Sequence, residues 1–226
     1  MASLIKALKN KEDIQYISRL IQDGEDVNAE DLYGYTALII ASGIEYQKTA
    51  NLPAMKLLIQ NGADVNAMDY SYSHTPLIAA SGFNNRANFK AIKLLIESGA
   101  DVNIFDVYRT TPLMYAAGIQ KYDMANVEAF KLLLENGADM DIVNIHGHTV
   151  FTVCTYPYNS ENLHLFQSAI NNHYRKQNLI FTAAIIYTNS APITKMGKFA
   201  KISSGPRQDW KMHINSFLSL DIEKNV

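Results

Sequence analysis

Apolar residues return along this chain in short clusters at nearly constant intervals. The clusters are Leu20-Ile21, Leu57-Leu58-Ile59, Leu94-Leu95-Ile96 and Leu132-Leu133-Leu134. Such pairs and triplets predict the buried stripe of a short helix, and we expect both leading leucines of the last three clusters to be buried. A glycine follows each cluster, where the left-handed conformation can end a helix without a Cβ clash. These glycines are Gly24, Gly62, Gly99 and Gly137.

Each glycine lies in a polar phrase that the chain repeats four times. The phrase reads Asp-Gly-Glu-Asp-Val-Asn up to Asn28, Asn-Gly-Ala-Asp-Val-Asn up to Asn66, Ser-Gly-Ala-Asp-Val-Asn up to Asn103 and Asn-Gly-Ala-Asp-Met-Asp up to Asp141. The intervals between these ends are 38, 37 and 38 residues. A fixed period in the range of about 20–50 residues predicts a stack of structural repeats in place of one globule.

A turn and a new helix are predicted after each phrase. The turn segments are 31–36, 69–75, 106–111 and 144–149, and the second carries one extra residue. Asp or Asn followed by Gly favours a turn. The pairs Thr75-Pro76 and Thr111-Pro112 then predict a threonine cap with proline at the first helical position.

In this order the units resemble ankyrin repeats, whose pattern runs Thr-Pro-Leu-His, a helix, a second helix ending in Leu-Leu, Gly-Ala-Asp-Val-Asn and a hairpin finger. The resemblance covers roughly residues 3–170, about five units, of which the last is degenerate. The first unit has Leu4, Ala7 and Leu8 on its first helix. The resemblance implies an all-α fold, an ankyrin-repeat solenoid of helix pairs with hairpin fingers.

The chain departs from the family pattern in three ways. The family histidine is replaced by Ile39, Ile78, Met114 and Thr152, so packing has to replace a polar network. The period exceeds the usual ~33 residues because three units carry extra residues between their helices, at 43–53, 82–89 and 118–126. Glycine is also missing from two finger tips.

Composition places the chain among ordinary soluble proteins. The single Cys154 excludes an intrachain disulfide and favours a reducing compartment. The first residues lack the apolar core of a signal peptide, and the apolar run near 179–187 is far shorter than the ~20 residues that span a bilayer. We therefore expect a cytoplasmic protein, or one in the host cytosol if it is a secreted effector, and no membrane contact.

Charge divides the chain after the repeats. Residues 1–170 hold 12 basic and 19 acidic residues, and residues 171–226 hold 8 and 3. We assign most of the repeated Asp residues to turns and caps. Residues 171–226 are predicted to be a helical capping segment, because Trp210, Ile214, Phe217 and Leu218 share one helical face. A basic tail for nucleic acid is the alternative, but its Lys and Arg residues are widely spaced.

Motifs for chemistry are sparse. His146 and His148 form a close histidine pair, yet no Cys or His cluster supplies further zinc ligands. Cys154 follows apolar residues and is predicted to be a buried thiol. Phosphate loops, paired carboxylates and serine elbows are missing, so we expect no catalytic residue, metal or cofactor. An enzyme with its site in 171–226 or at the junction with the repeats stays the alternative, with His164, His173 and His213 as its best residues.

Aromatic residues at the finger tips are the candidate contact surface. In the ankyrin family the fingers and first helices form a concave binding face, and the resemblance places these tips on it. Tyr and Arg are also enriched in interface hot spots, although packing between fingers would explain some of them equally well. The candidates are Tyr33, Tyr35, Tyr70, Tyr72, His74, Phe105, Tyr108 and Arg109. The longer interhelix loops offer a second surface through Tyr46, Arg86 and Tyr122.

We therefore expect residues 1–170 to form the solenoid and residues 171–226 its cap. The expected function is non-enzymatic binding of another protein through the concave finger face, with no small-molecule substrate. The role is either that of an adaptor or effector that recruits a target, or that of an inhibitor or immunity-type protein that covers an active site. Repeat scaffolds bind many partners, so the partner is not identified.

Overall fold

The computed structural model describes residues 3–44, 50–82, 87–118, 126–154, 166–173 and 175. The chain divides into two units, Met1–Tyr174 and Arg175–Val226, and only one residue of the second unit is described. The predicted cap at 171–226 therefore lies almost entirely outside the described residues and stays a prediction. Within the described ranges the regular structure is helical, with one isolated bridge between Glu30 and Thr36.

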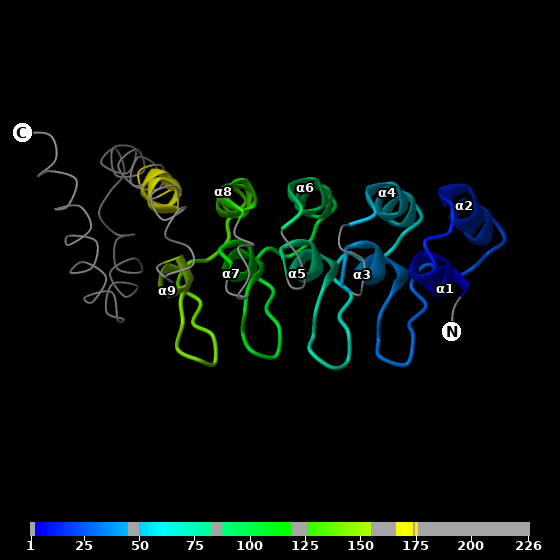
Figure 1. Cartoon of the computed structure of the whole chain (residues 1–226), viewed down its shortest axis with the longest axis horizontal. Helices are drawn as coiled ribbons and strands as arrows, with labels where there is room; N and C mark the ends of the chain where they lie inside the picture. The colour runs from blue at the N-terminus through cyan, green and yellow to red at the C-terminus, as the bar shows by residue number, and fades with distance from the viewer. Residues whose placement is uncertain are drawn as a thin grey trace, which may run out of the picture. The chain divides into compact units, whose positions relative to one another are not determined.

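The helices form pairs that repeat along the first unit. The first helices are α1 (Ser3–Lys9), α3 (Ala37–Ala41), α5 (Pro76–Ala80), α7 (Pro112–Ala116) and α9 (Val150–Cys154). Their partners are α2 (Ile14–Gln22), α4 (Leu52–Gln60), α6 (Phe89–Glu97) and α8 (Val127–Glu135), and residues 166–173 are also helical. Figure 1 shows the first helices in one layer, the second helices in another, and a hairpin finger extending from the first layer at each junction.

Local sequence explains where the helices begin. Thr36, Thr75 and Thr111 cap the first helices, and each Oγ1 accepts from the backbone N–H three residues later at 3.3 Å. Pro76 and Pro112 occupy the first helical position, as the sequence predicts. The second helices have asparagine caps that the sequence analysis did not identify, namely Asn51, Asn88 and Asn126.

The core is one cluster of buried apolar side chains, mainly alanine, leucine and isoleucine, contributed by both helix layers. Leu58, Leu95 and Leu133 are fully buried, as predicted. The prediction for the leucine that precedes each of them was wrong, because Leu57, Leu94 and Leu132 are only half-buried. Neighbouring residues on a helix are about 100° apart, so the leucine one position before each fully buried leucine lies toward the edge of the stack. On α1, Leu4, Ala7 and Leu8 are buried as expected.

Apolar packing replaces the missing family histidine in three units. Ile39, Ile78 and Met114 are all buried inside their first helices. Thr152, in the degenerate unit, is exposed. That unit packs through aromatic contact, since the Phe130 and Phe166 rings meet edge to face at 4.9 Å. No helix of the described ranges has the length and apolarity needed to cross a membrane.

Candidate protein-binding face

Each finger is folded around a buried acid or amide at its base. Asp31 Oδ1 accepts the N–H groups of Tyr33 (2.9 Å) and Tyr35 (3.1 Å). Asp106 Oδ1 does the same for Tyr108 (2.9 Å) and Thr110 (2.8 Å). These side-chain to backbone bonds fix the turn. A backbone bond across each finger supports it, for example from Asp31 N–H to Tyr35 O at 3.1 Å. The assignment of the repeated Asp residues to turns is confirmed for these positions.

The buried acids meet different partners in successive repeats. Lys9 lies 3.0 Å from Asp31, and the Tyr115 hydroxyl donates to Asp106 Oδ2 at 2.6 Å. Burial alone would raise the pKa of Asp31, but the N–H donors of the turn and Lys9 lower it overall. The carboxylates of Asp31 and Asp106 are therefore satisfied by interactions inside the repeat stack.

Neighbouring fingers are joined through their backbones. Tyr70 N–H donates to Tyr33 O at 2.9 Å, and Val107 N–H donates to Tyr72 O at 3.0 Å. Ile145 N–H continues the series to Tyr108 O at 3.0 Å. Each finger thus donates to the one before it, and four tips form one connected edge.

The last residue of the repeated phrase clamps each repeat to the next. The Asn28 side chain donates to Gly62 O at 3.0 Å and accepts from Asp64 N–H at 2.8 Å. Asn103 does the same with Gly137 O (3.1 Å) and Asp139 N–H (2.7 Å). The amide supplies one donor and one acceptor at once, which explains why asparagine stands here. The sequence analysis noted the repetition but not this bridging role.

A row of stacked rings runs along the tips. The Tyr72 and Tyr108 rings are 6.2 Å apart with an interplanar angle of 28°, and the Tyr108 and His146 rings are 6.5 Å apart at 20°. Both tyrosines keep about two-fifths of their surface exposed. We call Tyr72, Tyr108 and His146 the ring row. Its members pack on one another and still expose part of their surface, so packing between fingers does not bury them completely.

Comparison with known proteins now decides the family. A family model described as ankyrin repeats (3 copies) matches residues 45–144. Residues 45–144 of the chain are ankyrin repeats. Its relatives include an ankyrin repeat protein of Acanthamoeba polyphaga mimivirus, 39% identical over 66 residues, or 29% of this chain and 12% of the relative. An ankyrin repeat protein of fowlpox virus (strain NVSL) is 43% identical over 58 residues, or 26% of this chain and 10% of the relative.

This chain matches only about a tenth of the length of those relatives. What carries over from the ankyrin family is therefore general. Ankyrin repeats mediate protein–protein interaction and are generally non-enzymatic modules. Cys154 is buried as predicted, and burial raises the pKa of its thiol to about 12, which keeps the thiol protonated at neutral pH.

The metal prediction concerns the histidine pair of the last finger. The His146 and His148 rings are 6.1 Å apart and tilted against each other. Within the described ranges, no cluster of three or more potential metal ligands exists.

His74 has to be removed from the predicted contact residues of the ankyrin fingers. Its side chain is 1% exposed, and its Nδ1 lies 3.0 Å from Asp69 Oδ2. Burial lowers the pKa of His74, while the nearby carboxylates of Asp69 and Asp106 oppose that shift. His74 stacks under the Tyr72 ring at 5.3 Å and supports the ring row from beneath.

Arg109 is partly a structural residue of its finger. It occupies the place of the missing tip glycine and takes the left-handed conformation (φ 57°). Its Nε donates to Val143 O at 3.2 Å, and its guanidinium lies 4.9 Å from the centre of the Phe105 ring. Arg109 therefore packs against the neighbouring finger and against its own, and part of it stays exposed.

The remaining tip candidates differ in exposure. Tyr33, Tyr70 and Phe105 are exposed, whereas Tyr35 is half-buried near Lys9. The Tyr70 hydroxyl donates to the carboxylate of Glu30, which raises the pKa of Tyr70. Tyr46, Arg86 and Tyr122 lie outside the described residues, so the second surface stays a prediction.

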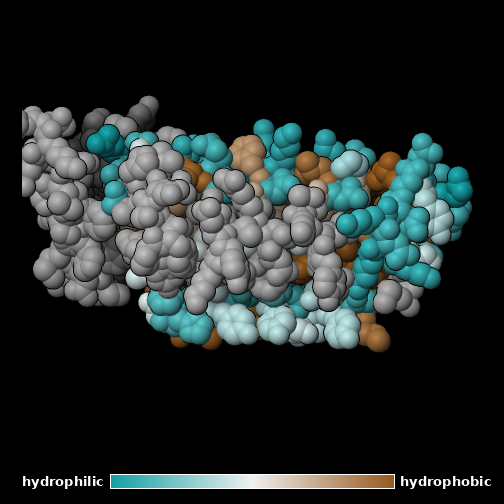
Figure 2. Space-filling view, in the orientation of Figure 1, coloured by the Kyte–Doolittle hydropathy of each residue, from teal (hydrophilic) through white to brown (hydrophobic). Residues whose placement is uncertain are grey.

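Aliphatic residues also line the tips, and the sequence analysis missed them. They stand directly before or after each finger-base residue, at equivalent places in successive repeats, and repetition was the signal that could have found them. They are Leu32, Met68, Val107, Val143 and Ile145, of which Leu32 is 94% exposed. In Figure 2 pale and brown atoms run along the finger edge, which is less hydrophilic than the teal surface of the second helices. The finger face is the name we give to these five aliphatic residues together with Tyr33, Tyr70, Phe105 and the ring row.

Proposed function

We propose that the finger face binds another protein. The observation that carries the proposal is a continuous edge of exposed apolar and aromatic side chains on a backbone that is already bonded from finger to finger. A contiguous apolar surface is unfavourable in water and marks an interaction site in a soluble protein.

The fixed backbone favours binding energetically. Asn28, Asn66 and Asn103 clamp each repeat to the next, and the finger tips are joined by backbone hydrogen bonds. A partner that docks on such a surface does not have to order it first, so little conformational entropy is lost. Tyrosine adds large contact area with few rotatable bonds.

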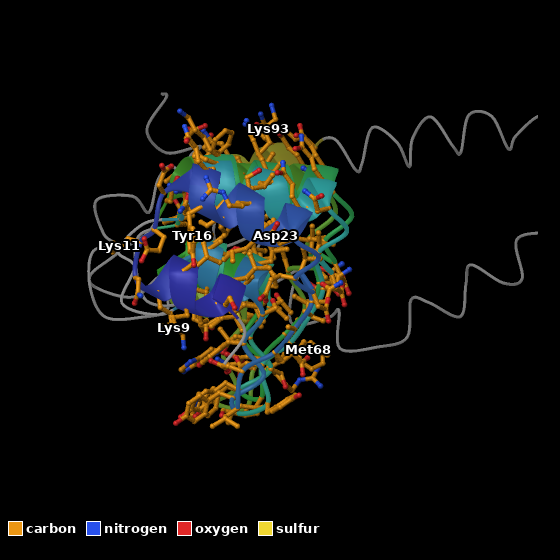
Figure 3. The ribbon with its side chains drawn as sticks, turned by 90° about the vertical axis from the view of Figure 1, so that its right-hand side faces the viewer. Lys9, Lys11, Tyr16, Asp23, Met68 and Lys93 are labelled. Atoms are coloured by element: carbon orange, nitrogen blue, oxygen red, sulfur yellow. The ribbon has the colours of Figure 1, made fainter. Side chains whose placement is uncertain are left out.

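The experiment compares capture by three versions of the full chain. Immobilised wild type, the double variant Tyr72→Ala/Tyr108→Ala and the variant Tyr16→Ala are exposed to the same native lysate. Tyr16 lies on α2 and is 43% exposed, against 42% for Tyr72 and 41% for Tyr108, so it controls for loss of an exposed tyrosine. In Figure 3 the Tyr16 label lies beside the helices, apart from the finger side chains at the lower end of the view.

We expect a protein captured by wild type and by Tyr16→Ala to be lost with the double variant. Central aromatic anchors dominate such interfaces, so the double variant should weaken binding by about 2 kcal/mol or more. Equal capture by all three versions would move the contact away from the finger face. Whether the bound protein is recruited or inhibited stays open, and the cytoplasmic location stays a prediction.

A further inference from the structure

The spacing of the ring row narrows the kind of partner that fits the finger face. The ring centres are 6.2 Å and 6.5 Å apart in two successive intervals. Side chains on one face of an extended strand recur about every 6.6–6.8 Å, because each residue rises about 3.3–3.4 Å. One turn of an α-helix advances only about 5.4 Å. A strand therefore stays in register with three successive rings, and a helix loses register by about 1 Å at each ring.

The finger face is almost free of available charge. Among residues 29–35, 67–74, 104–110 and 142–148, the exposed Asp, Glu, Lys and Arg side chains are Glu30 and Arg109. Both already interact inside the face, Glu30 with the Tyr70 hydroxyl and Arg109 with Val143 O and the Phe105 ring. Away from these two side chains, a charged segment would lose its hydration here without gaining a partner of opposite charge. Electrostatic complementarity therefore favours an uncharged ligand.

Tyrosine suits contact with an extended backbone. Its ring packs against apolar side chains, and its hydroxyl both donates and accepts hydrogen bonds. An extended segment presents side chains and free backbone N–H and C=O groups on the same stretch. The flanking Val107 and Ile145, both exposed, widen the apolar track beside the rings.

We propose that the finger face binds an extended, uncharged polypeptide segment with an apolar side chain at every second residue, and that these alternate side chains pack along Tyr72, Tyr108 and His146. This inference rests on the proposed function and specifies its partner. Single-stranded nucleic acid also stacks on aromatic rows, but it needs a positive groove. Residues 1–170 carry an excess of acidic residues, 19 against 12 basic ones, so the peptide is favoured.

The test selects ligands without assuming a pattern. A phage-displayed library of random 12-residue peptides is selected on the full chain, with counter-selection on Tyr72→Ala/Tyr108→Ala. The readout is the position of apolar residues in the enriched peptides. We expect apolar residues at alternate positions and few charges. Enrichment at every third and fourth position would show a helical ligand and overturn the inference while leaving the proposed function intact.

Binding measurements then connect the selected peptide to the rings. The best peptide is synthesised with a fluorescent label, next to a scrambled version of the same composition and a labelled oligothymidine. We expect wild type and Tyr16→Ala to bind the selected peptide within about 2-fold of each other and the double variant to bind at least about 10-fold more weakly. The scrambled peptide needs no variant and tests the pattern even if the double variant folds poorly.

Three further results would overturn the inference. The scrambled peptide could bind as well as the selected one, the enriched peptides could bind the double variant equally, or the oligothymidine could bind more tightly than the peptide with a steep salt dependence. If no peptide is enriched and the lysate protein still depends on the ring row, only the extended-segment inference fails. If the double variant captures the lysate protein as well as wild type does, the proposed function itself is contradicted.

Discussion

Asn66 holds the backbone of the following repeat at two points through one side chain. Its Nδ2 donates to Gly99 O at 3.2 Å, and its Oδ1 accepts from Asp101 N–H at 2.9 Å. The same geometry occurs at Asn28 and Asn103, so the contact is the regular joint of the stack. The stability of each joint can therefore be measured by replacing one residue.

We expect Asn66→Ala to lower the free energy of unfolding by about 1–2 kcal/mol, because two solvent-exposed hydrogen bonds of about 0.5–1.5 kcal/mol each are lost. Asn66→Asp keeps the acceptor and loses the donor, so its effect should be smaller. Urea unfolding followed by circular dichroism measures both. If Asn66→Ala changes the free energy by less than about 0.3 kcal/mol, the joint contributes nothing measurable and helix packing alone holds the repeats together.

Gly34 leaves room for Tyr70 of the next finger because it has no side chain. A Cβ at this position would come within 2.7 Å of Tyr70 Cδ1 and 2.8 Å of Tyr70 N, and its φ is +81°. Gly147 has nearly the same backbone (φ +77°) with nothing within 4 Å. Gly147→Ala should cost about 1–2 kcal/mol for the left-handed conformation alone. Gly34→Ala should cost at least about 1 kcal/mol more, because the backbone of the neighbouring finger has to move.

Equal melting temperatures for these two glycine variants would show that Tyr70 moves aside at no cost. In that case the first two fingers would not be rigidly joined. The preorganisation argued for the finger face would then not extend to its first finger.

Replacing Leu95 and Leu94 separately tests which face of α6 packs into the core. Leu95 is fully buried and Leu94 half-buried. Leu95→Ala should destabilise the protein by about 2–5 kcal/mol because it opens a cavity in the middle of the stack. Leu94→Ala should cost clearly less. Thermal and urea unfolding measure the stability of the two variants. A larger loss of stability for Leu94→Ala would mean that α6 is rotated relative to the register described above.

His74 should make stability depend on pH in the weakly acidic range. Burial places the folded-state pKa of His74 below its usual 6.5, so below that pH the unfolded chain binds a proton that the folded chain refuses. This contribution to stability is complete above about pH 6.5 and is lost as the pH falls, with a slope of at most about 1.4 kcal/mol per pH unit. Unfolding free energies between pH 7.5 and 5 for wild type and His74→Gln provide the measurement. Parallel curves for the two proteins would contradict the assignment to His74.

The features that the sequence predicted well are local ones. Thr75-Pro76 and Thr111-Pro112 begin helices wherever they occur, and a glycine after an apolar cluster ends one, so the helix pairs followed from short segments. The partner of Asn66 lies 35 residues away, and no local rule connects it to Asp101. The asparagines appeared in the sequence only as part of a repeated phrase.

The candidate surface was predicted less completely, for two physical reasons. His74 was expected at the surface because it lies in a turn segment, but the residue directly before the capping threonine packs against the finger-base acid, as Thr110 does in the next finger. Leu32 and Ile145 were missed because apolar residues are normally assigned to the core, and only their equivalent places in the first and fourth fingers set them apart. Exposure became visible only after the fingers were placed side by side.

The asparagine contact has the same form at three junctions, so it does not depend on which two repeats it joins. Each joint needs only an amide at the end of one phrase and a Gly-Ala-Asp sequence, or its equivalent, in the next, so this pair of bonds can form again when a whole period is duplicated or removed. Removal of residues 67–103, for example, would bring Asn66 opposite Gly137 and Asp139 in place of Gly99 and Asp101. The fourth phrase cannot form this contact, because it ends in Asp141, whose carboxylate has no amide donor. A further repeat could not be joined to it by the same pair of bonds.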